Sequence, residues 1–152
     1  MKYRLLSLEE LETLTPEFVN FLSAHGIVGE DWAKIKAKDA ARTAEFLELF
    51  SDMVLEKALQ NIQFLEFRLP SELKLFQCGA EEIDLIGISV SEQSFDFLQN
   101  NLSDLAKIPS DQIKILRISK KYSQPRESEI FAMLGWGCTI AQRNVFERVE
   151  GL

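Results

Sequence analysis

The apolar residues of this chain change their spacing near Asn61. Before this point they recur every three or four residues, as Phe46, Phe50 and Val54 do, which is the pattern of one helix face. After it they fall in short runs of strand length, such as residues 83–91. The change predicts an α+β fold in which a helical layer precedes a sheet.

Start and stop signals divide the first part into helices. Ser7 and Glu10 have the spacing of a capping box, and Gly26 is placed to end a helix in the left-handed conformation. The other predicted boundaries are a helix start at Thr15-Pro16-Glu17 with Thr15 as cap, a short helix from Glu30 to about Lys38 with Trp32 and Ile35 facing inward, and a long helix capped by Asp39 that runs to about Gln60.

The middle of the chain predicts a mainly antiparallel four-stranded sheet. Strands are expected at 62–69, 73–78 and 83–91, and their short connections favour a meander. A crossover helix is expected between Glu92 and Lys107, where leucines and Phe95 recur at helical spacing. The fourth strand is predicted at 113–121, where mixed alternation suggests a bulge.

The last segment predicts helices packed on the sheet. Pro125-Arg126-Glu127 is a helix start, and Gly135-Trp136-Gly137 interrupts the helix that follows. One alternative is a continuous helix, but two internal glycines would each cost it about 1 kcal/mol, so a break is preferred. Thr139-Ile140-Ala141-Gln142 then reads as a second capping box that restarts a helix to about Val149.

Nothing in the chain reads as a flexible linker. At 152 residues it has the size of one domain. The prediction is a single α+β domain over 1–152 with one shared core, comprising a helical layer at 7–60, a sheet with crossover helix at 62–121 and C-terminal helices at 125–150.

Charge and composition narrow the functional classes. The net charge of −7 and the pI near 4.8 disfavour nucleic acid and anionic membranes as partners. No apolar run approaches the roughly 20 residues of a membrane-spanning helix, and the N-terminus does not resemble a signal peptide. The two cysteines are too few for a disulfide framework or a zinc site. A cytoplasmic location is expected, without metal or cofactor.

For two groups of titratable residues, we expect a structural role rather than a catalytic or binding role. His25 is the only histidine, and its place just before Gly26 suits a helix end better than catalysis. The acidic residues of the long predicted helix form a stripe that is expected to be a solvated face, with a basic partner surface and cation binding as alternatives; its members are Glu45, Glu48, Asp52 and Glu56.

The densest positive region surrounds the fourth predicted strand. Lysines on an edge strand block sheet-to-sheet pairing, whereas cations with aromatic residues on a sheet can also bind nucleic acid. We favour the edge-strand reading and keep Tyr122 and Arg126 as candidate ligand- or partner-binding residues. The cations are Lys114, Arg117, Lys120, Lys121 and Arg126.

The most distinctive local motif is Gly135-Trp136-Gly137-Cys138. A tryptophan between glycines can expose its ring to a partner or ligand, although most tryptophans are largely buried. Cys138 is a conceivable nucleophile, but no histidine is nearby, and free cysteines usually pack as small apolar residues. Trp136 and Cys138 complete the candidate binding residues, and no catalytic residue is assigned.

Three segments resemble a known family: the opening MKYRLLSLEELE, the stretch Phe50-Ser51-Asp52, and the closing helix with its Gly-Cys pair. They are similar to an uncharacterised bacterial family, of the Bacteroidetes type, described only as a domain of unknown function. The resemblance covers nearly the whole chain and implies a bacterial cytoplasmic protein. It carries no activity to transfer.

The leading functional hypothesis is a non-catalytic protein–protein interaction or assembly module, expected to form a homodimer. It rests on the missing catalytic constellations and on aromatic residues in excess of what a small core hides, namely eleven phenylalanines and two tryptophans. The alternative is a small-ligand-binding domain or a carboxylate-based enzyme, with a pocket near Trp136 and Cys138.

Overall fold

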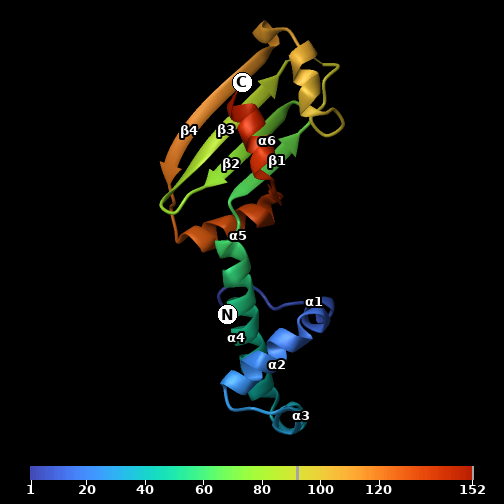
Figure 1. Cartoon of the computed structure of the whole chain (residues 1–152), viewed down its shortest axis with the longest axis vertical. Helices are drawn as coiled ribbons and strands as arrows, with labels where there is room; N and C mark the ends of the chain where they lie inside the picture. Colours follow the sequence, from blue (N-terminus) through green and yellow to red (C-terminus); the bar gives the residue numbers. More distant parts are fainter. Residues whose placement is uncertain (92, 152) are drawn as a thin grey trace. The chain divides into compact units, whose positions relative to one another are not determined.

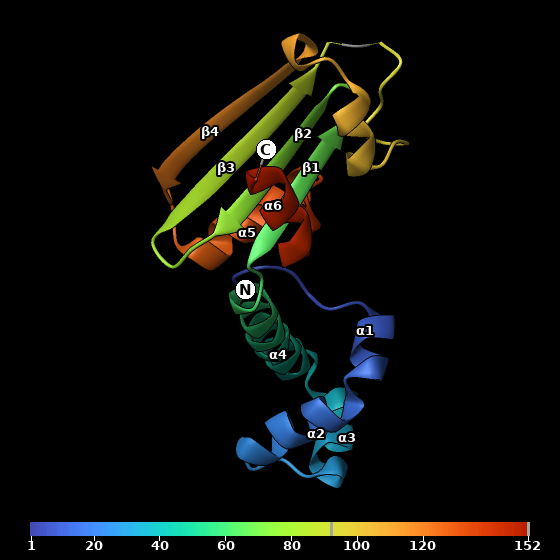
Figure 2. The same ribbon diagram turned by 45° about the horizontal axis from the view of Figure 1, so that its top comes forward.

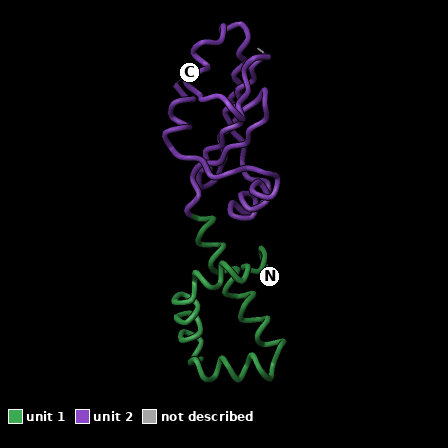
Figure 3. The backbone as a smooth tube through the Cα atoms, turned by 90° about the vertical axis from the view of Figure 1, so that its right-hand side faces the viewer, with its two compact units in different colours: residues 1–60 green, residues 61–152 purple. Residues whose placement is uncertain are grey.

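A computed structural model describes residues 1–91 and 93–151. The chain divides into two compact units, residues 1–60 and residues 61–152 (Figure 3). Each unit has a cluster of buried apolar side chains of its own. The prediction of one domain with a single shared core stays a prediction.

The first unit is helical, as its apolar spacing predicts. Phe50 is fully buried at the centre of its core, where its ring lies 4.9 Å from that of Phe18 and 5.3 Å from that of Phe21. Trp32 and Ile35 pack against this cluster, as expected. The helices are α1 (Leu8–Thr13), α2 (Thr15–Ala24), α3 (Gly29–Lys38) and α4 (Ala40–Gln60) (Figure 1).

Local side-chain chemistry sets most of the helix ends. The predicted capping box is present: Ser7 Oγ accepts from Glu10 N–H, and Glu10 accepts from Ser7 N–H. Gly26 has φ 74°, and Asp39 accepts from Arg42 N–H at 3.0 Å. The cap of α2 differs by one position. Thr15 is already helical, and its hydroxyl donates to a carbonyl of the preceding helix.

The segment before α1 is held on α4 by hydrogen bonds. Asp52 accepts the backbone N–H groups of Lys2 and Tyr3 at 2.7 and 3.0 Å. Ser51, which is buried, accepts the N–H of Leu6 through its hydroxyl at 3.0 Å. These contacts satisfy the backbone of a segment that belongs to no helix or sheet.

The second unit is built on a five-stranded antiparallel sheet in the order β4-β3-β2-β1-β5. The predicted meander and fourth strand are present (Figure 1). The elements are β1 (Phe64–Leu69), β2 (Glu72–Cys78), β3 (Glu82–Val90), the 3-10 helices η1 (Leu102–Lys107) and η2 (Ser110–Gln112), β4 (Ile113–Lys121), α5 (Arg126–Trp136), β5 (Thr139–Ile140) and α6 (Arg143–Glu150).

The fifth strand corrects the prediction of a capping box at Thr139. The preferred break in the last helix is confirmed, since α5 ends at Trp136 and Gly137 follows with φ 113°. Thr139 and Ile140 then pair with Glu66 and Leu65 on the edge of β1, and α6 begins only at Arg143. Pairing with β1 gives this backbone hydrogen-bond partners that the local sequence does not reveal.

The crossover connection contains a 3-10 helix rather than an α-helix over its described part. Glu92 lies outside the described residues. Asp96 Oδ1 accepts from Leu98 N–H at 2.8 Å, and Asn100 Oδ1 accepts from Asp96 N–H at 2.9 Å. These side-chain bonds compete with the helical backbone pattern, so only η1 forms.

The two faces of the sheet are covered differently. α6 packs on one face, where Phe146 and Val149 join a core with strand residues that include Leu75 and Ile88 (Figures 1 and 2). α5 lies on the opposite face. Two contacts show this: Glu129 pairs with Lys120, and the backbone of Gly137 approaches Phe67. These strand positions alternate with those of the α6 face.

Candidate interaction surface

The face that carries α5 is buried at one end and open at the other. Beneath α5, Leu65, Cys78 and Ile83 are buried. Farther along the same face, Leu116 is 56% exposed and Ile118 45% exposed. We call the less covered part the open face; its apolar residues are Phe67, Leu69, Phe76, Leu85, Gly87, Leu116 and Ile118. Glu72 and Lys74 lie on the same face, with Lys74 between Phe67 and Gly87.

The register of β4 explains the mixed alternation that suggested a bulge. Each residue from Ile113 to Lys121 pairs one-to-one with β3, so this pair contains no bulge. Ile113 and Ile115 lie on the α6 face, while Leu116 and Ile118 lie on the open face. The mixed alternation therefore comes from an edge strand that carries apolar residues on both of its faces.

Gly87 forms a hollow in the open face. Its missing side chain leaves a depression of about 470 Å³ bordered by Leu85, Leu116 and Lys74. A Cβ at Gly87 would meet only the Cβ of Leu116, at 3.8 Å, which is ordinary van der Waals contact. The glycine is thus not required by its neighbours, and its effect is to shape the surface.

Trp136 is exposed at the end of α5. Its side chain is 66% exposed, which contradicts the general expectation that tryptophan packs inward. Gly137, the next residue, lies against the Phe67 ring of the open face, at 3.5 Å from the position that a Cβ would take. The end of α5 at Gly137 therefore lies beside Phe67 of the open face.

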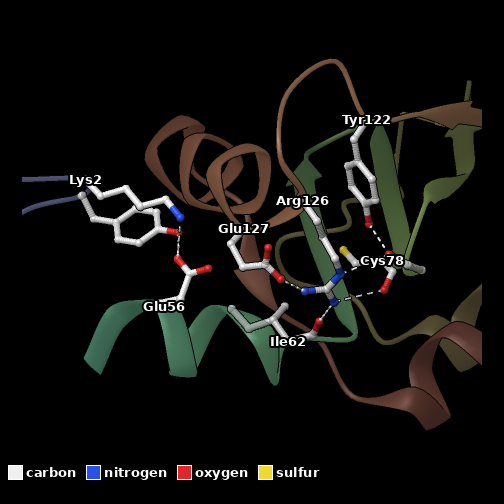
Figure 4. Close-up of polar contacts among 9 residues, drawn as sticks. Lys2, Glu56, Ile62, Cys78, Tyr122, Arg126 and Glu127 are labelled. Atoms are coloured by element: carbon white, nitrogen blue, oxygen red, sulfur yellow. Dashed lines mark hydrogen bonds and ion pairs between the residues drawn. The ribbon is translucent and has the colours of Figure 1, made fainter. Parts of the chain in front are cut away.

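Arg126 and Tyr122 bind the chain's own backbone (Figure 4). Arg126 Nε donates to Gly79 O at 3.0 Å, and its Nη2 donates to Ile62 O and Cys78 O. Its Nη1 pairs with Glu127 at 3.2 Å. Tyr122 Oη also donates to Gly79 O, at 2.8 Å. Both residues anchor the start of α5 to the strand ends, which is a structural role.

The two cysteines are buried thiols. Burial raises the pKa of Cys78 to about 11 and also raises the pKa of Cys138. At neutral pH both thiols are protonated, and a thiol is a much weaker nucleophile than a thiolate. Neither cysteine fits the role of an activated nucleophile.

The four candidate binding residues do not form one site. Arg126 and Trp136 are the two ends of α5, an 11-residue helix, and so stand about 15 Å apart. Cys138 is buried and Tyr122 is bonded to the backbone, so Trp136 alone presents most of its side chain to solvent. The sequence singled out the tryptophan but gave no sign of the open face beside it.

The cations around β4 also divide between the two sheet faces. Arg117 lies on the α6 face and donates to Glu150 O at 3.0 Å, whereas Lys120 lies on the α5 face and pairs with buried Glu129. β4 is an edge strand, as predicted from its lysines. The basic residues therefore do not form one continuous surface.

The acidic stripe of α4 is partly used for folding. Asp52 and Glu56 receive the N-terminal segment, Glu56 through Lys2 and the Tyr3 hydroxyl (Figure 4). Within residues 1–91 and 93–151, no group of three or more acidic, histidine or cysteine side chains is arranged to hold a metal ion. His25 ends α2, where its Nδ1 lies 2.9 Å from Phe21 O.

Comparison with known proteins gives a family without an assigned activity. A model of a family of unknown function, DUF6495, matches residues 1–152. The chain belongs to this family. Neither the search of curated proteins nor that of solved structures found a match. Among the described residues of this DUF6495 protein, no helix combines the length and apolar character needed to span a membrane.

Proposed function

We propose that this DUF6495 protein is a non-catalytic assembly module that forms a homodimer through the open face. The observation that carries the proposal is the set of exposed apolar side chains on this face, Leu69, Leu116 and Ile118, together with the exposed ring of Trp136 at the end of α5. Contiguous exposed apolar surface marks interaction sites, and tryptophan is enriched among the residues that dominate binding.

Charge supports a second copy as the partner. The open face carries side chains of both signs: Glu72 and Lys74 on β2, which form an ion pair at 3.9 Å, and Lys114 on β4. A two-fold axis places the same surface of both copies in contact, so the acid of one copy can pair with a base of the other. The surface is therefore suited to self-association.

Pairing through the edge of the sheet is disfavoured. An antiparallel match of β4 with its own copy, centred between Arg117 and Ile118, would set Lys114 opposite Lys121. Directly opposed like charges destabilise strand pairing. The open face, rather than the β4 edge, is the favoured contact.

Sedimentation equilibrium over a wide concentration range tests the dimer. We expect the wild-type chain to dimerise and the double variant Leu116→Lys/Ile118→Lys to remain monomeric, because lysines cannot be buried unpaired in an apolar contact. Leu98→Lys is the matched control, since Leu98 is 59% exposed and lies outside the open face. A wild-type chain that stays monomeric at every concentration overturns the proposal, as does a double variant that dimerises like the control.

The variant Gly87→Val tests the role of the hollow without unfolding the chain. Valine favours strands and the site has room for a Cβ, so the variant is expected to fold. It fills the hollow, and dimer formation is expected to weaken.

The proposal includes the bacterial, cytoplasmic setting that the sequence suggested, in which two buried free thiols remain reduced.

A further inference from the structure

A separate pocket lies on the α6 side of the second unit. It has a volume of about 380 Å³, within the range of small-molecule sites. Leu105 and Val149, both buried, belong to the core beneath it. Its lining comes from η1, η2, β4 and α6, namely Leu102, Ser103, Leu105, Ala106, Ser110, Ile113, Ile115, Arg148 and Val149.

One cation stands at this apolar pocket. Within the described residues, Arg148 has no hydrogen-bond, ion-pair or ring partner. The other six arginines each contact a carboxylate, a carbonyl, an amide or an aromatic ring. The hydroxyls of Ser103 and Ser110 likewise bind no described residue. The pocket thus combines an apolar interior with unused polar groups.

The apolar lining and the single cation indicate which class of ligand the pocket can bind. A guanidinium binds a carboxylate through two parallel hydrogen bonds, and the apolar lining favours a hydrocarbon body. A single arginine neutralises one negative charge, whereas the net charge of −7 repels polyanions such as nucleotides. We infer that the pocket binds a small amphipathic monocarboxylate, with its carboxylate on Arg148 and its apolar chain against Leu105, Ile115 and Val149.

Isothermal titration with octanoate tests the inference. The wild-type chain is expected to bind octanoate, and Arg148→Gln to bind it about tenfold more weakly or worse, which is the usual loss for one charge-assisted hydrogen bond. Octanol, which lacks the charge, is expected to bind both proteins alike. Arg143→Gln is the matched control, because Arg143 lies on the same helix but does not line the pocket.

A second variant locates the site. Ala106→Leu adds bulk to the pocket wall without changing charge, and it is expected to weaken octanoate and octanol together. NMR of the methyl groups of Ile115 and Val149 reports binding directly, even if a variant loses stability. Absence of octanoate binding to the wild-type chain overturns the inference, as does equal affinity in Arg148→Gln. Because the pocket and the open face lie on opposite sheet faces, either proposal can fail alone.

Discussion

At the scale of single residues, this chain uses polar side chains mainly to complete its own backbone. Arg126 gives three of its donor contacts to main-chain carbonyls, and Ser51 receives a buried N–H from Leu6. A buried backbone group without a partner is costly, so these residues are structural even where their chemistry resembles that of a binding site. The sequence singled out Arg126 as a candidate for ligand or partner binding, and that role stays a prediction beside the contacts with main-chain carbonyls.

Ser51→Ala is expected to lower the free energy of unfolding by about 1–3 kcal/mol, because it leaves the buried N–H of Leu6 without an acceptor. Denaturant unfolding followed by the fluorescence of Trp32, which packs in the same unit, measures the change. Thr13→Ala is the control, since the Thr13 hydroxyl is exposed and bonds its own helix. Equal losses in the two variants would contradict the assigned role of Ser51.

The two glycines that flank Trp136 are expected to respond in opposite ways. Gly135→Ala meets no atom within 4 Å and raises helix propensity, so it is expected to stabilise the fold by up to about 1 kcal/mol. Gly137→Ala is expected to destabilise it, because Gly137 has φ 113°. Thermal unfolding of both variants beside the wild type checks the signs; stabilisation by Gly137→Ala would be inconsistent with the observed end of α5.

At the scale of elements, α5 is tied to β4 by one buried carboxylate. Glu129 is 3% exposed, accepts from the N–H and hydroxyl of Ser123, and pairs with Lys120 at 3.4 Å. Burial alone would raise its pKa, but these hydrogen bonds outweigh burial and hold the pKa below the usual value of 4.5. The ionised form is therefore part of the folded state.

This link predicts a pH dependence. A carboxylate with a lowered folded-state pKa stabilises the fold above its unfolded pKa, near 4.3, and that contribution is lost as the pH falls through the folded value. Glu129→Gln is expected to be less stable than the wild type at pH 7, and the difference is expected to shrink below about pH 4.3. Urea unfolding at a series of pH values measures it. A difference that stays constant down to pH 2 would show that ionisation of Glu129 is not involved.

The ends of helices and strands could be predicted from the sequence where neighbouring residues determine them. The Ser7 capping box, Gly26, Asp39 and Gly137 all act within a few residues of a helix end, so their positions could be predicted. One error arose where distant backbone competes with the local pattern, and the other where local side-chain bonds replace the helical backbone bonds. β5 forms because the edge of β1 accepts it, and the crossover is shaped by side-chain bonds around Asp96.

At the scale of the whole molecule, the second unit has unequal sheet faces. One is covered by α6 and forms a continuous core, while α5 covers only part of the other. This asymmetry provides the apolar surface proposed for the dimer. If the surface is buried between two copies, the unfolding midpoint is also expected to rise with protein concentration, since dimer formation favours the folded state by mass action.

The sequence by itself determined the elements, their order and most of their ends, because helical and strand periods and caps are properties of neighbouring residues. Only the tertiary structure decided that Leu116 and Ile118 lie on an uncovered face, that Arg126 binds carbonyls, and that Arg148 stands at an apolar pocket. Each depends on which distant segments lie beside a residue, and the spacing of residues along the chain does not encode that directly.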